Sequence, residues 1–225
     1  MIIELKNIGK YYINPGTSIR RDVLIDINLE LNSGDSIAIV GPSGSGKSTL
    51  LNIMGTLDIP TSGEINIKGK AITSMDEKGL AAIRNKTIGF IFQMHHLLPQ
   101  LNLLDNVLLP ILPNIDRKTF KDKSKRAVEL LEYVGLADRI HQRPGQLSGG
   151  ECQRAAVIRA LINQPELILA DEPTGSLDQD SAEQVGNLLV KINKDFNIAL
   201  IVVTHSQTLA EKMGKILRLT KGKLE

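Results

Sequence analysis

The chain has 225 residues, 42% hydrophobic and 23% charged, which is typical of one globular domain with a full core. Its formal net charge of +2 is too small to indicate a nucleic-acid partner, and we expect none. Its one cysteine, Cys152, excludes an internal disulfide. The longest apolar runs, such as 198–203, are far below the roughly 20 residues that span a bilayer, and the charges within 1–6 argue against a signal peptide. We therefore expect no direct membrane insertion.

The beginning of the sequence predicts antiparallel strands. Residues 2–8 and 24–31 alternate apolar and polar side chains, as half-buried strands do, and a turn-rich connection lies at 14–16. Residues 63–69 alternate likewise, and 88–92 form another short strand. These segments predict a β-rich unit that precedes the rest of the core.

Residues 41–49 match the phosphate-binding pattern G-x-x-x-x-G-K-[ST], after the apolar run 36–40 and before the helix-competent run 49–54. The glycines let successive backbone N–H groups point at one phosphate chain, and the positive end of the following helix completes an anion site. Lys47 would hold the β- and γ-phosphates of a nucleotide, and Ser48 would bind Mg²⁺. The strand and helix around this P-loop argue against a chance glycine-rich turn. The predicted nucleotide contacts here are Gly41, Pro42, Ser43, Gly44, Ser45, Gly46, Lys47, Ser48 and Thr49.

After residue 92 the pattern becomes helical. Apolar residues recur at i, i+3, i+4 and i+7 in 127–134, and Pro110 and Pro113 break the run before them. The apolar runs 167–170 and 198–203 then predict parallel strands that are covered on both faces.

Together these segments predict an α/β fold with a P-loop NTPase core, in which a mostly parallel sheet has helices on both faces. An antiparallel β subdomain precedes this core, and an α-helical subdomain is inserted at about 94–163. All of it is expected to form a single domain spanning 1–225.

Asp171 and Glu172 end the apolar strand 167–170 and predict the second half of a nucleotide-hydrolysis site. Asp171 can hold Mg²⁺, while Glu172 can polarise an attacking water. A solvated acidic turn is the alternative, and the P-loop in the same chain argues against it.

Residues 147–151, Leu-Ser-Gly-Gly-Glu, open a helix-competent segment at 152–163 and predict a second phosphate cradle at a helix N-terminus. With Gln153 and Arg154 after them, they resemble the signature motif of ATP-binding cassette (ABC) ATPases. The resemblance covers essentially the whole chain and implies the ABC ATPase fold. The residues of this predicted cradle are Ser148, Gly149, Gly150 and Glu151.

The other motifs of that family occur in the same order. The resemblance implies that Gln93 contacts Mg²⁺ and the attacking water, and that His205 contacts the γ-phosphate. Asp178, in Ser-Leu-Asp, matches a further nucleotide-site loop of the family. Tyr12 matches the aromatic residue that stacks on adenine, with Tyr11 as the alternative.

Within the family, 92–99 and 141–144 resemble the lipoprotein-releasing (LolD-like) branch, with the macrolide-exporter (MacB-like) and cell-division (FtsE-like) branches as alternatives. Cys152 and Ser206 depart from the usual pattern. Since Cys152 begins a helix, its thiol pKa would be lowered if it were exposed. An inert buried cysteine is the alternative.

The resemblance further implies two copies packed head to tail, with each ATP held between the P-loop of one chain and the signature of the other. Integral membrane permease subunits are the expected partners, so the chain would work peripherally at the cytoplasmic face of the bacterial inner membrane. Met94 and Leu97 are candidate anchors for them. A soluble ABC ATPase would need a second cassette or a long coiled coil, and a P-loop kinase would need no second cradle.

Overall fold

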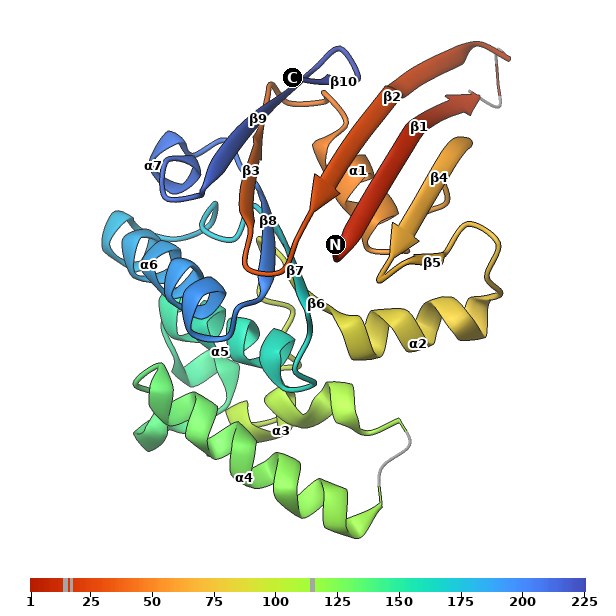
Figure 1. Cartoon of the computed structure of the whole chain (residues 1–225). Helices are drawn as coiled ribbons and strands as arrows, with labels where there is room; N and C mark the ends of the chain where they lie inside the picture. Colours follow the sequence, from red (N-terminus) through yellow and green to blue (C-terminus); the bar gives the residue numbers. More distant parts are fainter. Residues whose placement is uncertain (14–15, 17, 114–115) are drawn as a thin grey trace.

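The computed structural model describes residues 1–13, 16, 18–113 and 116–225 (Figure 1). Asn14 and Pro15, in the predicted connection, lie outside the described residues. The strands are β1 (Ile3–Ile13), β2 (Arg20–Leu31), β3 (Ser36–Val40), β4 (Ser62–Ile67), β5 (Lys70–Ala71), β6 (Ile88–Ile91), β7 (Leu167–Asp171), β8 (Ala199–Val203), β9 (Lys215–Thr220) and β10 (Lys223–Leu224). The helices are α1 (Lys47–Met54), α2 (Glu77–Thr87), α3 (Leu103–Leu108), α4 (Arg117–Tyr133), α5 (Gly149–Leu161), α6 (Gln179–Asp195) and α7 (Gln207–Ala210), with 3-10 turns η1 (Leu109–Ile111), η2 (Ala137–Arg139) and η3 (Pro144–Gln146).

The central sheet has six strands in the order β10-β9-β3-β8-β7-β6, and the five strands from β9 to β6 are parallel. Both of its faces are buried. In β7, Leu167 and Leu169 pack with the four-stranded sheet and α1, whereas Ile168 and Ala170 pack with α5 and α6. This arrangement explains the unbroken apolar runs and confirms the predicted α/β class.

The second sheet is antiparallel, in the order β2-β1-β4-β5. Its first two strands are longer than predicted, because β1 continues to Ile13 and β2 already begins at Arg20. Irregularities in their register, with a left-handed backbone at Asn7 and Asp26, break the alternation of side chains. A pattern of period two therefore detects only the regular parts of these strands.

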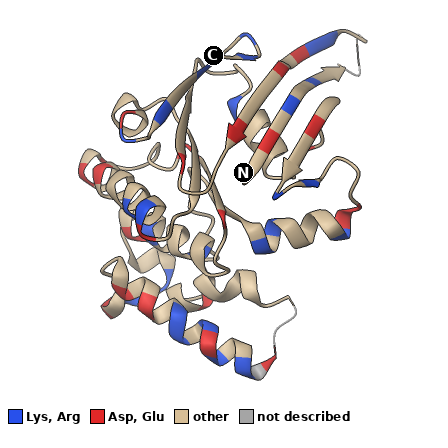
Figure 2. Cartoon of the chain, in the orientation of Figure 1, with Lys and Arg blue, Asp and Glu red and all other residues tan. Residues whose placement is uncertain are grey.

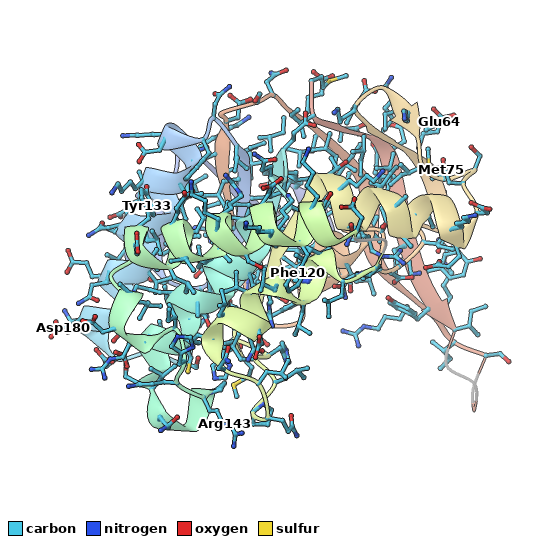
Figure 3. The ribbon with its side chains drawn as sticks, turned by 90° about the horizontal axis from the view of Figure 1, so that it is seen from below. Glu64, Met75, Phe120, Tyr133, Arg143 and Asp180 are labelled. Atoms are coloured by element: carbon cyan, nitrogen blue, oxygen red, sulfur yellow. The ribbon has the colours of Figure 1, made fainter. Side chains whose placement is uncertain are left out.

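Between β6 and β7 the chain forms α3, α4 and α5, which pack on the face of the central sheet opposite the second sheet (Figure 1). The C-terminal end of α4 is fixed to α6, since the Tyr133 hydroxyl donates to Asp195 at 2.7 Å and its ring meets Phe196 edge to face. Phe120, near the other end of α4, is exposed (Figure 3). All four apolar residues of the predicted helical repeat are buried: Ala127, Leu130, Leu131 and Val134.

Charged residues lie mainly on the helices and on the outer strands, while the central strands are almost free of them (Figure 2). In β3, β7 and β8, all of which are described, Asp171 is the single charged residue. The fold thus places one carboxylate at the carboxyl end of a buried strand, where open parallel sheets bind their ligands.

Candidate active site

The P-loop connects β3 to α1, and its backbone conformation requires glycine. Gly46 has φ of 105° immediately before Lys47, the first residue of α1. A Cβ atom there would lie 2.9 Å from the Val23 carbonyl oxygen, so a side chain is excluded both by conformation and by space. The Lys47 ammonium lies over the loop and donates to the carbonyl oxygens of Gly41 at 2.9 Å and Pro42 at 3.0 Å.

A cavity of about 590 Å³ opens beside this loop. It is lined by residues from the P-loop, from the ends of β1 and β2, and from the end of β7. They are Tyr12, Arg21, Val23, Ser43, Gly44, Gly46, Lys47, Ser48, Thr49, Asp171 and Glu172. The fold therefore brings the P-loop, the acidic pair and Tyr12 together, as predicted. Arg21 and Val23 were missed, and their position follows from the pairing of Tyr12 with Arg21 across β1 and β2.

Asp171 has the donor atoms that a divalent cation needs. Its Oδ1 is buried without a hydrogen-bond partner, although Ser48 bonds the same carboxyl group. Burial raises the pKa of Asp171, which the Glu172 charge reinforces and Ser48 and Lys47 oppose. Mg²⁺ prefers one or two carboxylates together with substrate phosphates, so this unpaired oxygen beside a hydroxyl fits Mg²⁺. In the described part of the chain, no group of three His, Cys, Asp or Glu residues is arranged as a self-contained metal site.

Glu172 is held by groups that follow β8. Its Oε2 accepts from Thr204 Oγ1 at 3.1 Å and from the His205 backbone N–H at 3.2 Å, and His205 Nδ1 lies 2.9 Å from the same oxygen. Its backbone is left-handed, with φ of 46°, and its N–H donates to the Val203 carbonyl at 2.8 Å. Strained backbone of this kind persists only where the surroundings fix it, and here β8 does so.

Gln93 lies two residues beyond β6 and next to the loop that follows Glu172. Its carbonyl oxygen accepts from Ser176 Oγ at 2.9 Å, and a Cβ atom on Gly175 would lie 3.0 Å from its Nε2. Gln93 is not among the described residues that line the cavity, and neither is Asp178, which caps α6 through the Ser181 N–H. Gln93 therefore lies close to the acidic pair without lining the cavity.

The predicted second cradle forms the N-terminus of α5. Ser148 accepts from the Glu151 N–H at 3.2 Å while Glu151 accepts from the Ser148 N–H at 2.8 Å, which is a complete capping box. Gly150 is packed against α6, since a Cβ there would lie 2.6 Å from Ser181 Oγ. None of these residues lines the cavity at the P-loop. Within one chain, the two predicted phosphate-binding elements are therefore separate.

Tyr12 is positioned by a small polar network. Its hydroxyl donates to Asp58 Oδ2 at 2.9 Å, and Lys10 Nζ lies 5.0 Å from the centre of its ring. The ring faces the cavity, whereas Tyr11 is covered by the Arg20 guanidinium at 4.2 Å. Of the two tyrosines, the geometry favours Tyr12 as a stacking surface.

Comparison with known proteins agrees with this geometry. The family model described as ABC transporter matches residues 24–175, which include the P-loop, the signature and the acidic pair. The chain belongs to the ABC transporter family. It is an ATP-binding cassette, and its enzymatic activity is that of an ATPase.

Individual relatives are similar over the full length of the chain. The lipoprotein-releasing system ATP-binding protein LolD of Legionella pneumophila (strain Paris) is 46% identical over 100% of this chain and 97% of its own length. LolD 1 of Rhodopirellula baltica is 48% identical over 99% and 96%.

Two solved structures have the same fold as this cassette. A dimeric bacterial ABC transporter cassette is 41% identical, with a TM-score of 0.89 over 100% of this chain and 97% of the other. A dimeric cassette with bound ADP and Pi, in a post-hydrolysis state, is 37% identical with a TM-score of 0.86 and the same coverage.

The structure decides between the two alternatives for Cys152 and corrects the expectation for Leu97. Cys152 is buried, and burial together with the Glu151 charge raises the pKa of its thiol, so the helix N-terminus does not activate it. Leu97 is also buried, 6% exposed, whereas Met94 is 60% exposed. Only Met94 of the two is available to a partner.

In the described part of the chain, no helix is long and apolar enough to cross a membrane.

Proposed function

We propose that this chain is the ATP-hydrolysing subunit of a transporter that releases lipoproteins from the bacterial inner membrane. The cargo class is supported by the names of relatives that are 46% and 48% identical over nearly the whole chain. The hydrolytic role is carried by one observation: Glu172, beside Asp171 at the P-loop cavity, has its carboxylate oriented by His205 and Thr204.

In this proposal the cavity holds ATP. Backbone N–H groups of 41–49 and the Lys47 ammonium bind the phosphates, and Tyr12 stacks on adenine. Lys47 would exchange its bonds to the Gly41 and Pro42 carbonyls for stronger charge-assisted bonds to phosphate. Ser48 and Asp171, with Gln93, would hold Mg²⁺, which when bound neutralises charge on the phosphates.

Glu172 would act on the water that attacks the γ-phosphorus. It accepts a proton from that water while the bond between the γ-phosphorus and the bridging oxygen breaks, giving ADP and phosphate. His205 would keep the Glu172 carboxylate in place and contact the γ-phosphate. The first of these roles is supported by the separation of 2.9 Å between His205 Nδ1 and Glu172 Oε2.

A second copy would complete each site. Ser148, Gly149, Gly150 and Glu151 form a helix N-terminus that is separate from the cavity of their own chain, so the γ-phosphate they bind belongs to ATP on the partner. Asp178 would lie at this junction. Two similar solved structures are dimers, which supports a head-to-tail pair.

Permease subunits would dock on a groove of about 390 Å³ between α2, β6, η1 and α5. Its apolar lining includes Leu57, Phe90, Phe92 and Pro110, and Leu57 is half exposed. It lies where the core meets the helical subdomain that we place at about 94–163 in a single domain spanning 1–225. Docking there would hold the chain peripherally at the cytoplasmic face of the inner membrane.

The test of hydrolysis is Glu172→Gln. The amide keeps the shape of the side chain but is a poor base, so we expect ATP binding to persist while kcat falls by about 10²- to 10⁴-fold. With Mg-ATP the variant should elute as a dimer on size-exclusion chromatography. Turnover at the wild-type rate would contradict the assignment of Glu172, and a monomer in the absence of hydrolysis would contradict the composite site.

The test of cargo is depletion of the chain in its native bacterium. Acylated proteins destined for other locations should then accumulate in the inner membrane, and permease subunits should co-purify with the tagged chain. Normal lipoprotein sorting after depletion would exclude lipoprotein release.

A further inference from the structure

The segment that follows β6 is held by side chains of α5. Residues 92–96 form no helix or strand. The Phe92 carbonyl accepts from Gln153 Nε2 at 2.9 Å. The carbonyls of His95 and His96 accept from the two terminal nitrogens of Arg159, at 2.7 Å and 2.6 Å.

The side chains of Gln153 and Arg159, which donate these bonds, are held by their surroundings. Gln153 is 1% exposed, and Arg159 is partly buried and binds both carbonyls at once. The rigid fork of a guanidinium suits two neighbouring carbonyls, which a single ammonium cannot bridge in the same way. His96 is held with φ of 48°, and its ring meets Phe92 edge to face at 5.3 Å. The bonds therefore stabilise a locally strained backbone.

Gln93 lies within this segment. We call Gln153 and Arg159, which bind the carbonyls on either side of Gln93, the clamp. The bonds to Gln153 and Arg159 fix the backbone on either side of it, and Ser176 binds its own carbonyl. Because α5 begins with the signature at Gly149, the position of Gln93 is tied to the helix that carries the second cradle. Arg159 also lines the groove between α2, β6, η1 and α5, so an occupant of that groove contacts the clamp directly.

We propose that Gln153 and Arg159 are positioning residues that set the place of Gln93 in the active site and connect it to the occupancy of the groove. The proposal rests on the role given to Gln93 in the proposed function. Neither residue touches ATP in this scheme; each acts through the backbone that carries Gln93.

The first test is Arg159→Lys, which keeps the charge but loses the fork. We expect kcat for ATP hydrolysis to fall about tenfold, the equivalent of about 1.4 kcal/mol, while the dissociation constant for ATP changes less than twofold. Lys123→Gln is the matched control, since Lys123 donates to the Ile162 carbonyl, just beyond the end of α5, at 3.0 Å and makes no bond to residues 92–96 among the described contacts. Its kcat should stay within twofold of wild type. An unchanged kcat for Arg159→Lys, or an equal loss in the control, would overturn the proposal.

A second variant tests the same proposal in case Arg159→Lys does not fold. Gln153→Met keeps the length of the buried side chain and removes the donor to Phe92. It should fold, as judged by a cooperative thermal transition, and show the same fall in kcat with unchanged ATP affinity. A folded variant with wild-type kcat would count against the clamp.

The decisive measurement combines Arg159→Lys with Gln93→Ala. If Arg159 acts through Gln93, the double variant should have the kcat of Gln93→Ala alone, because positioning an absent side chain has no effect. Losses that multiply would mean a general structural role and refute the proposal. Glu172→Gln in the same assay separates the two hypotheses: if it is active, the proposed function fails, whereas if it is inactive and Arg159→Lys is unaffected, only the clamp fails.

Discussion

At the scale of single residues, Asp171 is a proposed ligand-binding residue that lowers the stability of the fold. It is the one charged residue in β3, β7 and β8, its Oδ1 is buried without a partner, and burial raises its pKa. A neutral residue of the same shape would be more stable there in the absence of ligand. Such residues are retained for what they bind.

We therefore expect Asp171→Asn to raise the thermal unfolding midpoint of the nucleotide-free protein. Removal of a half-buried charge should contribute about 1 kcal/mol, which corresponds to roughly 2–4 °C for a chain of this size. Calorimetry without Mg²⁺ or nucleotide measures it, and Asp180→Asn on the exposed first turn of α6 (Figure 3) is the control, with a change of less than about 0.5 kcal/mol. A lower midpoint for Asp171→Asn would mean that the carboxylate stabilises the fold.

Lys47→Ala should separate binding from folding. Loss of one charge-assisted contact to phosphate should weaken ATP binding by about 10- to 100-fold. The fold should survive, because the Gly41 and Pro42 carbonyls that Lys47 contacts can bond to water instead. Titration calorimetry measures the affinity, with Lys70→Ala on the exposed β5 as the control. Near-normal affinity in Lys47→Ala would contradict the assignment of the P-loop.

Sequence patterns predicted some residues of the active site and missed others. The P-loop and the acidic pair were evident because their chemistry depends on neighbours in sequence. Arg21 was not, since its place in the cavity follows from the strand register that sets it opposite Tyr12. Nor could the sequence indicate that Glu172 has a left-handed backbone, because bonds to β8 impose it.

At the scale of elements, the N-terminus of α5 has two properties that one substitution can separate. Ser148 caps the helix, and in the proposed dimer it also faces a phosphate. Aspartate is an equally good cap, but its charge repels phosphate. Ser148→Asp should therefore keep the thermal midpoint within about 0.5 kcal/mol of wild type and prevent dimer formation with Mg-ATP in the Glu172→Gln background.

The control is Ser148→Ala, which loses the cap without adding charge. It should lower stability by about 1 kcal/mol, or roughly 2–4 °C. Size-exclusion chromatography and thermal scans on both variants make the comparison. A dimer that persists in Ser148→Asp would place the second cradle away from the phosphate.

The elements that sequence analysis did not predict share a physical cause. Only Leu80 and Thr87 of α2 are buried, so its apolar stripe is too weak to detect. In β9, whose sequence is KILRLT, Leu217 and Leu219 are buried while Ile216 is exposed, so the pattern is weak there as well. A segment with strong periodicity, 127–134, was predicted correctly.

At the scale of the whole molecule, the segment after Gln93 has one exposed apolar residue, Met94, and one buried residue, Leu97. Met94→Glu should fold normally and bind ATP with wild-type affinity but lose stimulation by permease subunits, because Met94 is 60% exposed. Leu97→Glu should unfold the chain, since it buries a charge in the core that includes α3 and α5. ATPase assays with reconstituted permease and circular dichroism distinguish the two. Normal stimulation of Met94→Glu would move the docking surface away from this segment.

The order of strands in the central sheet also has a consequence for how the protein is made. β3, which leads into the P-loop, pairs with β8 on one side and β9 on the other, so its neighbours are residues 199–203 and 215–218. On the ribosome, the phosphate-binding sequence emerges early but lacks both supporting strands until most of the chain has followed. We therefore expect a nascent chain to bind ATP only after residues 215–218 have left the ribosome. Until then the phosphate-binding loop lacks the neighbouring strands that hold β3 in place.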